Sequence, residues 1–421
     1  IQENHVLQRV ASITWDDLKV RRTIWSMAFQ GALERPLTGW GQEGFNYVFN
    51  KYYDPSLYNQ EPWFDRAHNA FIDWLTAGGL PAFLLYLSLF GSAIVMLWRS
   101  SELSRPERTL LTAALAGYAV HNLFVFDNLY SYIYFFAILA LIDSQVAQPI
   151  RHLEEAPELS AEEGMTYALP IATVVALALI WFVNVPGMQV AGKLITALSP
   201  SAAGFNGNFA TFQDLAARPS FAAQEIREQI VSFAVSVAQS SQTTDTEKQQ
   251  GVSLAITEMQ KQVTAYPLDA RARLQLSYAY RTAGNNADAL KEVEAAIVLS
   301  PKKEGFWIEK GMIEVRQGDF KAAQKDFYTA YVLGPSFPDL AAYAVESAIL
   351  ADDLSFASEV LLRAEPAVGV NTWFSLAAAY YKAGDTANAI QIINTAVARY
   401  PDAASSGAAA IAQIEGKTVG Q

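Results

Sequence analysis

Two clusters of polar residues near the start of the chain have the side chains needed for chemistry on a phosphate. Residues 65–69, which include Arg66 and His68, stand directly before a hydrophobic stretch long enough to cross a bilayer, and Arg21 and Arg22 lie upstream of them. Arginine binds phosphate through a planar, permanently charged fork, whereas neutral histidine accepts protons. Placed together at a membrane surface, these groups suggest chemistry on a lipid-linked phosphate.

His68 is the candidate general base. Asp65 is expected to cap a helix over residues 66–77, which Gly78-Gly79 would close. This helix would place His68 in its first turn, where the positive end of the helix dipole disfavours the imidazolium, and a neutral imidazole can accept a proton. The structural alternative, an interfacial histidine that only forms a hydrogen bond near a helix start, stays open.

Arg21 and Arg22 lie on an expected amphipathic helix over residues 16–35, which Pro36 ends. Trp25 is four residues from Arg21 and three from Arg22, so both arginines flank the apolar face. One of the two could simply be a solvated surface residue. Both arginines are candidates for binding phosphate.

Arg66 and Asn69 complete the expected substrate-binding residues. The chain has no cysteine and four histidines, and none of these is spaced from an acidic partner in a zinc pattern, so neither a metal nor a cofactor is expected. His121, Asn122 and Asp127, near the end of an expected spanning helix, are interpreted as a structural hydrogen-bond network.

The composition indicates a membrane protein without a nucleic-acid partner. Hydrophobic residues make up 52% of the 421 residues and charged residues only 17%, and the apolar excess lies before about residue 190. The net charge is −12 and there is no long basic run, which argues against nucleic acid because phosphate-backbone binding requires a cationic surface.

Four stretches have the length and composition of membrane-spanning helices. Arginine in the loop over residues 99–108 marks that loop as cytoplasmic, which places residues 1–79 and everything after about residue 188 outside. The four expected spans are residues 80–98, 109–126, 131–147 and 168–185.

The last third of the chain is an internal repeat. Prolines, glycines and alanines recur every 34 residues, at Pro267, Pro301 and Pro335, at Gly284 and Gly318, and at Ala289, Ala323 and Ala357. This period and pattern resemble the tetratricopeptide repeat, whose small residues let paired helices pack closely and bury a continuous core. A third unit is degenerate, because Asp352 stands in place of the glycine.

The N-terminal motifs, taken together, resemble the O-antigen ligase/polymerase family of bacterial membrane proteins. The resemblance covers residues 15–145 and is carried by Arg21, Trp25, Pro36-Leu37, Gly39-Trp40-Gly41, Phe45, His68-Asn69 and Gly78-Gly79. It implies a metal-independent glycosyltransferase that moves a glycan from undecaprenyl diphosphate to an acceptor hydroxyl outside the inner membrane. The family's essential arginine falls best on Arg21, with Arg22 second, and its essential histidine falls on His68. The resemblance therefore implies that Arg21 and His68 are catalytic and that Arg22 binds substrate.

The resemblance also implies that this chain is truncated. Family members have more than four spanning helices and a second essential arginine in an earlier loop, and this chain begins at Ile1 without a signal peptide. We therefore expect the N-terminal part of a larger multi-pass protein of the bacterial inner membrane to be missing.

The expected fold is all-α, with a polytopic transmembrane bundle followed by a tetratricopeptide solenoid. Its expected divisions are residues 1–79 as an extracytoplasmic catalytic region, 80–188 as spanning helices, 189–250 as linker and capping helices, and 251–421 as repeats. The acceptor could be lipid A-core, a glycan or a protein, the last making it a protein O-oligosaccharyltransferase. The competing class is a non-enzymatic membrane-anchored scaffold whose repeats recruit a protein partner.

Overall fold

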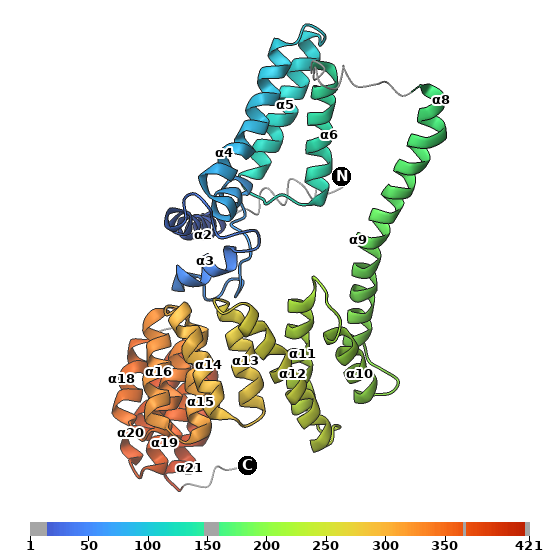
Figure 1. Ribbon diagram of the computed structural model, residues 1–421. Helices are drawn as coiled ribbons and strands as arrows, with labels where there is room; N and C mark the ends of the chain where they lie inside the picture. The colour runs from blue at the N-terminus through green and yellow to red at the C-terminus, as the bar shows by residue number, and fades with distance from the viewer. Residues whose placement is uncertain (1–14, 147–159, 365–367, 417–421) are drawn as a thin grey trace, which may run out of the picture. The chain divides into compact units, whose positions relative to one another are not determined.

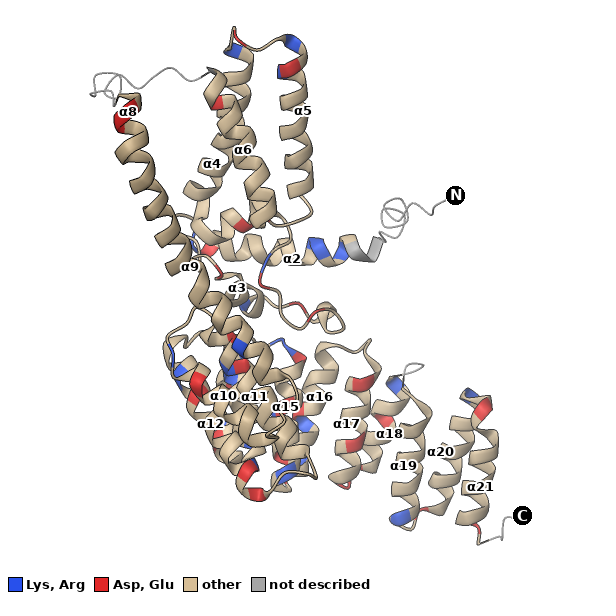
Figure 2. Cartoon of the chain, turned by 90° about the vertical axis from the view of Figure 1, so that its right-hand side faces the viewer, with Lys and Arg blue, Asp and Glu red and all other residues tan. Residues whose placement is uncertain are grey.

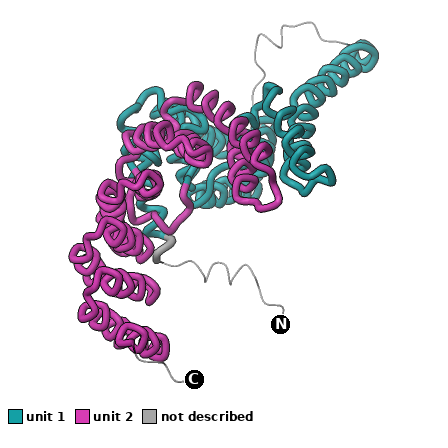
Figure 3. The backbone as a smooth tube through the Cα atoms, turned by 90° about the horizontal axis from the view of Figure 1, so that it is seen from below, with its two compact units in different colours: residues 1–52, 63–226 teal, residues 53–62, 227–421 magenta. Residues whose placement is uncertain are grey.

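The computed structural model describes residues 15–146, 160–364 and 368–416, and every regular element in these ranges is helical (Figure 1). The chain divides into two compact units. The first comprises residues 1–52 and 63–226, and the second comprises residues 53–62 and 227–421 (Figure 3). The all-α class is therefore as expected, and the second unit contains the repeats.

The first helices of unit 1 carry the candidate site. Helix α2 (Trp15–Glu34) ends two residues before Pro36, as predicted, and it is followed by the short helix α3 (Phe45–Lys51). Helix α4 (Ala70–Arg99) is capped by Asn69, whose side chain accepts hydrogen bonds from two backbone N–H groups. The prediction that Asp65 caps a helix over residues 66–77 is therefore wrong.

A close backbone approach joins the end of α2 to a kink in α4. Trp40 N donates to Thr76 O (2.9 Å), and Leu80 N donates to Pro36 O (2.7 Å). Gly79 has φ +67° inside α4, and a Cβ built on it would lie 2.5 Å from Pro36 O. Only glycine fits here, because it combines a left-handed backbone with the absence of a side chain.

Two helices are long and apolar enough to cross a membrane. They are α4, with 30 residues, and the continuous helix over Ala161–Leu198, with 38 residues, which contains α8 (Ala161–Glu163) and α9 (Leu169–Leu198). Two of the four expected spans thus meet the criterion. The other two correspond to α5 (Arg105–Asn122) and α6 (Leu129–Val146), which have 18 residues each.

Helices α4, α5 and α6 pack around an aromatic cluster. The rings of Phe90 and Phe135 lie 4.9 Å apart, and those of Tyr118 and Phe135 lie 4.7 Å apart. Charged residues of α4, α5, α6 and α9 are confined to the regions near the helix ends (Figure 2). This distribution is the one expected where the middle of a helix faces hydrocarbon.

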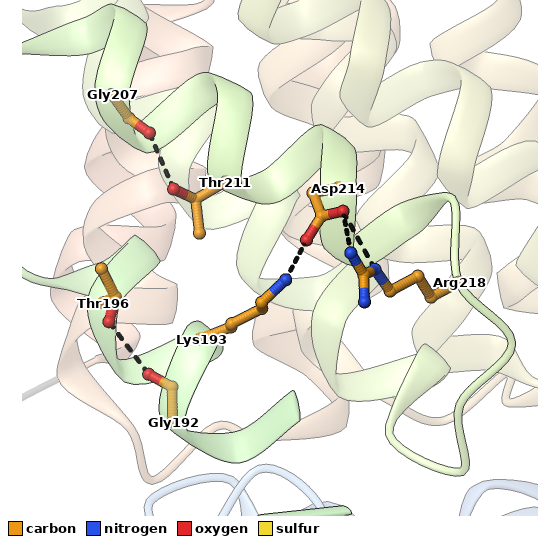
Figure 4. A network of polar contacts seen from close by, with 7 residues as sticks. All are labelled: Gly192, Lys193, Thr196, Gly207, Thr211, Asp214 and Arg218. Atoms are coloured by element: carbon orange, nitrogen blue, oxygen red, sulfur yellow. Dashed lines mark hydrogen bonds and ion pairs between the residues drawn. The ribbon is translucent and has the colours of Figure 1, made fainter. Parts of the chain in front are cut away.

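The end of α9 is fixed to α10 (Phe205–Ala216) by a small charge network (Figure 4). The Lys193 ammonium donates to Asp214 Oδ2 (2.5 Å), and the Arg218 guanidinium donates to Asp214 Oδ1 (2.7 Å). Within the helices, the Thr196 and Thr211 hydroxyls donate to carbonyls four residues earlier, so both hydroxyls are paired locally. The network orients α10 where the apolar helix ends.

Unit 2 is a stack of paired helices. The first three pairs follow the 34-residue period, a fourth pair begins 32 residues after the third, and α11 and α12 precede them. The helices are α11 (Ala223–Gln239), α12 (Asp245–Ala265), α13 (Ala270–Thr282), α14 (Asn286–Leu299), α15 (Glu304–Gln317), α16 (Phe320–Leu333), α17 (Pro338–Leu350), α18 (Leu354–Arg363), α19 (Val370–Lys382), α20 (Thr386–Arg399) and α21 (Ala404–Ile414).

The repeat positions found in the sequence have a structural reason. Ala289, Ala323 and Ala357 are completely buried where paired helices meet. Gly284 and Gly318 have φ +77° and +78° at the turn between the helices of a pair. Asp352 takes the same left-handed conformation, with φ +60°, because aspartate tolerates this region better than most residues do.

Replacing Gly79 with alanine tests the contact between α4 and the end of α2. We expect Gly79→Ala to destabilise the protein by ~2 kcal/mol, because the methyl group meets Pro36 O and the backbone becomes strained. Gly91→Ala in the same helix is the matched control, since a Cβ there meets nothing within 4 Å. Thermal unfolding in detergent measures the melting temperatures of both variants. Equal melting temperatures would contradict the close contact between Gly79 and Pro36.

A buried carboxylate in the repeats makes stability depend on pH. Burial raises the pKa of Glu309 from 4.5 to about 7, while its ion pair with Arg281 opposes the rise. The folded state therefore binds the proton more tightly than the unfolded state. Its contribution to stability is complete below pH 4.5 and is lost as the pH rises to about 7.

We expect Glu309→Gln to flatten this pH dependence. Between pH 5 and pH 7, the melting temperature of the wild type should fall, and that of Glu309→Gln should fall by ~2–4 °C less. This difference is the shift that ~1 kcal/mol of stability produces in a domain of this size. Glu359→Gln is the control, because Glu359 and its partner Arg363 are exposed. If the melting temperature of Glu309→Gln depended on pH as strongly as that of the wild type, Glu309 would not be the source of the pH dependence.

Candidate functional site

Arg21 and the segment around His68 meet the same part of unit 1, the loop between α5 and α6 (residues 123–128). The Arg21 guanidinium donates through Nη1 to Phe124 O. One turn further along α2, the Trp25 indole donates to Ala67 O (3.0 Å). Helix α2 thus contacts both the α5–α6 loop and the residue before His68.

His68 lies between two anchored neighbours. Ala67 is completely buried, its N–H donates to Asp73 Oδ1 (2.7 Å), and Asn69 is 4% exposed. Between them His68 is half-buried and has φ +54°. A left-handed histidine costs of order 1–2 kcal/mol, and such strain persists only where the surroundings enforce it. The expected place in the first turn of a helix is therefore corrected, because His68 precedes the cap of α4.

The His68 ring lies among aromatic side chains. Its centroid is 5.7 Å from that of Phe64 and 5.4 Å from that of Phe126, both in edge-to-face geometry. These two rings restrict the rotation of the imidazole, and Phe126 belongs to the loop that accepts from Arg21. His68 and Arg21 therefore contact neighbouring residues of one short segment.

Asn69 has a positioning role. Its side-chain oxygen accepts from Phe71 N (3.0 Å) and Ile72 N (3.1 Å), and its amide nitrogen donates to Leu123 O (3.0 Å). Ala70 N donates to Val125 O (3.2 Å). The sequence signal for this role was the residue type, since asparagine is among the best helix caps.

Three successive carbonyls of the α5–α6 loop therefore hold the site. Those of Leu123, Phe124 and Val125 accept from the Asn69 amide, the Arg21 guanidinium and the Ala70 N–H. Sequence analysis did not find this loop, because main-chain acceptors carry no residue signature.

A buried network holds the same loop from the side of the aromatic cluster. Asp127 accepts from the hydroxyls of Tyr86 (2.7 Å) and Tyr118 and from the amide of Asn122 (3.0 Å). Asn122, which is completely buried, also donates to the Tyr86 hydroxyl (2.8 Å). The expected structural network is confirmed for Asn122 and Asp127 but not for His121, which is exposed and is not among the residues that these bonds join.

Arg66 lies at an open pocket beside the loop. The pocket is lined by Gln42, Arg66, Ala70, Asp73, Trp74, Phe126, Asp127 and Tyr132. Arg66 pairs with Glu43 (2.5 Å), an acidic residue that sequence analysis missed. The lining combines one cation, two carboxylates and aromatic faces, which suits a polar ligand with hydroxyl groups and an apolar side.

Arg22 is exposed on α2, whereas its neighbour Arg21 is half-buried. The pair is thus divided between a surface residue and a residue bound to the α5–α6 loop. Arg35, outside the site, covers the Trp40 ring at 3.9 Å. Among the described residues, no group of three or more histidine, aspartate or glutamate side chains is placed to hold a metal ion.

Comparison with known families finds matches in both the N-terminal region and the repeats. Residues 4–87 match the family model described as O-antigen ligase. The N-terminal part of the chain is thus similar to the O-antigen ligase family. Tetratricopeptide repeat models match residues 247–304, 274–341 and 357–404. Both resemblances expected from the sequence are confirmed, and the ligase match includes Arg21, Arg66 and His68 but not the α5–α6 loop.

Solved structures similar to this chain include several repeat proteins. MamA shares 18% identity, with 37% of this chain and 93% of MamA covered and a TM-score of 0.32. A thermophilic repeat protein of Thermus thermophilus shares 16% identity, with 45% and 98% covered and a TM-score of 0.29. A repeat protein of Parabacteroides merdae shares 15%, with 45% and 75% covered and a TM-score of 0.33. A search of curated proteins found no match.

Replacing Asn69 tests how His68 is held. We expect Asn69→Ala to cost ~1–2 kcal/mol of local stability, so that amides of the first turn of α4 exchange hydrogen about ten times faster. Asn285→Ala is the matched control, because Asn285 caps α14 in the repeats. Hydrogen exchange with mass spectrometry reads both helices. Unchanged exchange at Phe71 and Ile72 in Asn69→Ala would contradict the capping role.

Proposed function

We propose that this protein is a membrane glycosyltransferase that moves a glycan from undecaprenyl diphosphate to an acceptor hydroxyl. The observation that supports this most is the convergence of Arg21 and His68 on one loop, residues 123–126. The O-antigen ligase match over residues 4–87, which contains both side chains, points to the same substrate class.

Arg21 is proposed to stabilise the leaving group. As the bond between the anomeric carbon and the diphosphate breaks, negative charge grows on the phosphate oxygens. A guanidinium can accept this charge without transferring a proton. Its bond to Phe124 O uses one of five N–H donors and fixes the direction of the planar fork.

His68 is proposed to act as the general base. The acceptor hydroxyl passes its proton to an imidazole nitrogen as its oxygen forms the new bond to the anomeric carbon. The position of His68 just before the α4 N-terminus disfavours a positively charged ring in the resting state, because the helix dipole is positive there. The neighbouring Phe64 and Phe126 rings reduce access of bulk water to the imidazole.

The remaining site residues are given different roles. Arg66, at the mouth of the pocket with Asp73 and Asp127, is proposed to bind the donor or its sugar. Asn69 is proposed to position His68 and not to contact substrate, because its oxygen and nitrogen are both used in protein hydrogen bonds. Exposed Arg22 is proposed to meet lipid phosphates outside the reacting centre.

We further propose a multi-pass protein of the bacterial inner membrane. The supporting features are the two long apolar helices, the shorter apolar helix α6, and the arginines between α4 and α5. In this arrangement the site and the repeats face the extracytoplasmic side. The acceptor, whether lipid A-core, a glycan or a protein, is identified by which product carries the glycan.

Substitution of the two central residues tests the proposal. In the full-length protein, His68→Ala is expected to lower the transfer rate ~10²–10⁴-fold, the usual effect of losing a general base. Arg21→Ala should be at least as severe, and Arg22→Ala milder. His121→Ala controls for loss of an imidazole, since His121 is exposed at the end of α5.

The measurement is glycan transfer from undecaprenyl diphosphate in membranes that hold equal amounts of each variant. Wild-type transfer in both His68→Ala and Arg21→Ala would overturn the enzymatic proposal. Such a result would favour a membrane-anchored scaffold, in which the repeats recruit a partner and these residues have no chemical role.

A further inference from the structure

Ten residues between α3 and His68 belong to the repeat domain by their contacts. The segment Tyr53–Pro62 groups with unit 2, whereas the chain on both sides of it groups with unit 1 (Figure 3). It contains one turn of 3₁₀-helix (Pro55–Leu57) capped by Asp54. Two of its side chains, Tyr53 and Leu57, are 4% and 2% exposed. The segment is therefore an ordered piece of the repeat domain, although the repeats begin far downstream in the sequence.

Tyr58 fixes the middle of the segment to the start of α17. Its hydroxyl donates to Asp339 Oδ2 (2.7 Å), and its ring centroid lies 5.0 Å from that of Phe337. The same side chain packs against the hydrophobic core that includes Leu340 and Ala341. One charge-assisted hydrogen bond and an aromatic contact thus combine at one residue.

Lys303 fixes both ends of the segment to the start of α15. Its ammonium donates to Pro62 O and lies 4.5 Å from the centroid of the Tyr53 ring. Lys303 is 6% exposed, and burial lowers its pKa to about 7. The ammonium has lost most of its water, and a backbone carbonyl and an aromatic face replace it.

The two anchoring residues occupy one position of the repeat. Asp269, Lys303 and Phe337 are spaced by 34 residues and stand at the caps of α13, α15 and α17. Asp269 caps its own helix through its side chain, as acidic or amide residues do at the start of the second helix of each pair, α14, α16, α18 and α20. Lys303 and Phe337 make no such bond and contact the segment instead.

We propose that Tyr53–Pro62 is a built-in ligand of the repeat domain, and that the starts of α15 and α17 form its binding surface. The consequence for the site rests on the function proposed above. Two residues after Pro62 comes Phe64, whose ring packs against His68. Holding the segment on the repeats therefore limits the freedom of the chain that carries the base, and the repeats act as a positioning element for transfer.

Tyr58→Phe in the full-length protein tests this inference, with Tyr380→Phe as matched control. Each change removes one tyrosine hydroxyl bound within unit 2, and Tyr380 bonds to Ser358 (2.6 Å) and Leu354 O, away from the segment. Tyr58→Phe should make amides of residues 53–62 exchange about ten times faster, as expected for a lost hydrogen bond to a carboxylate. Tyr380→Phe should leave them unchanged. Lys303→Met, which keeps the apolar stem, should act like Tyr58→Phe.

Steady-state transfer provides the second readout. A positioning role predicts that Tyr58→Phe lowers kcat several-fold with less than about a twofold change in KM for the acceptor. Unchanged exchange at residues 53–62 in Tyr58→Phe and Lys303→Met would overturn the docking itself. Faster exchange with wild-type kcat would overturn the positioning role. If the wild-type protein transfers no glycan while exchange still responds, docking stands and the proposed enzymatic function fails.

Discussion

Three consecutive backbone carbonyls, those of Leu123, Phe124 and Val125, connect the parts of unit 1 on which the candidate site depends. They accept hydrogen bonds from Asn69, Arg21 and Ala70, so that α2, the chain before α4 and the α5–α6 loop share one set of bonds. Because these three carbonyls belong to consecutive residues of one short loop, a movement of the loop displaces all three acceptors. A shift of the loop would therefore move the guanidinium and the His68 segment as one group, and the buried Asp127 network resists that shift.

The strained backbone at His68 fits this arrangement. A histidine with positive φ is unfavourable in isolation, yet Ala67 and Asn69 on each side are buried and hydrogen-bonded. The neighbours thus enforce a conformation in which the imidazole lies against the Phe64 and Phe126 rings. The contact between Gly79 and Pro36 supports the same region, because it fixes the kink of α4 against the end of α2. Strain at one residue is maintained by contacts from several elements.

The features that could be predicted are those that depend on the residue type at one position or on a regular spacing. Pro36 ends α2, and the 34-residue spacing identified the helix pairs with the turns at Gly284 and Gly318. The prediction of the helix cap was wrong because Asp65 and Asn69 are both residue types that cap helices well. Long-range hydrogen bonds from Trp25 to Ala67 and from Asn69 to Leu123 favour Asn69 as the cap. The carbonyl acceptors and the docking of Tyr53–Pro62 depend on contacts between distant residues, which no local pattern records.

We propose that Arg21 and His68 serve one reaction centre. The most direct measurement is an experimental structure of the full-length protein with a bound undecaprenyl-diphosphate donor. The account predicts diphosphate oxygens within ~3 Å of the Arg21 guanidinium nitrogens, with the His68 ring facing the anomeric carbon from the side where the acceptor enters. A diphosphate bound away from Arg21, or a His68 ring that faces away from the sugar, would contradict it.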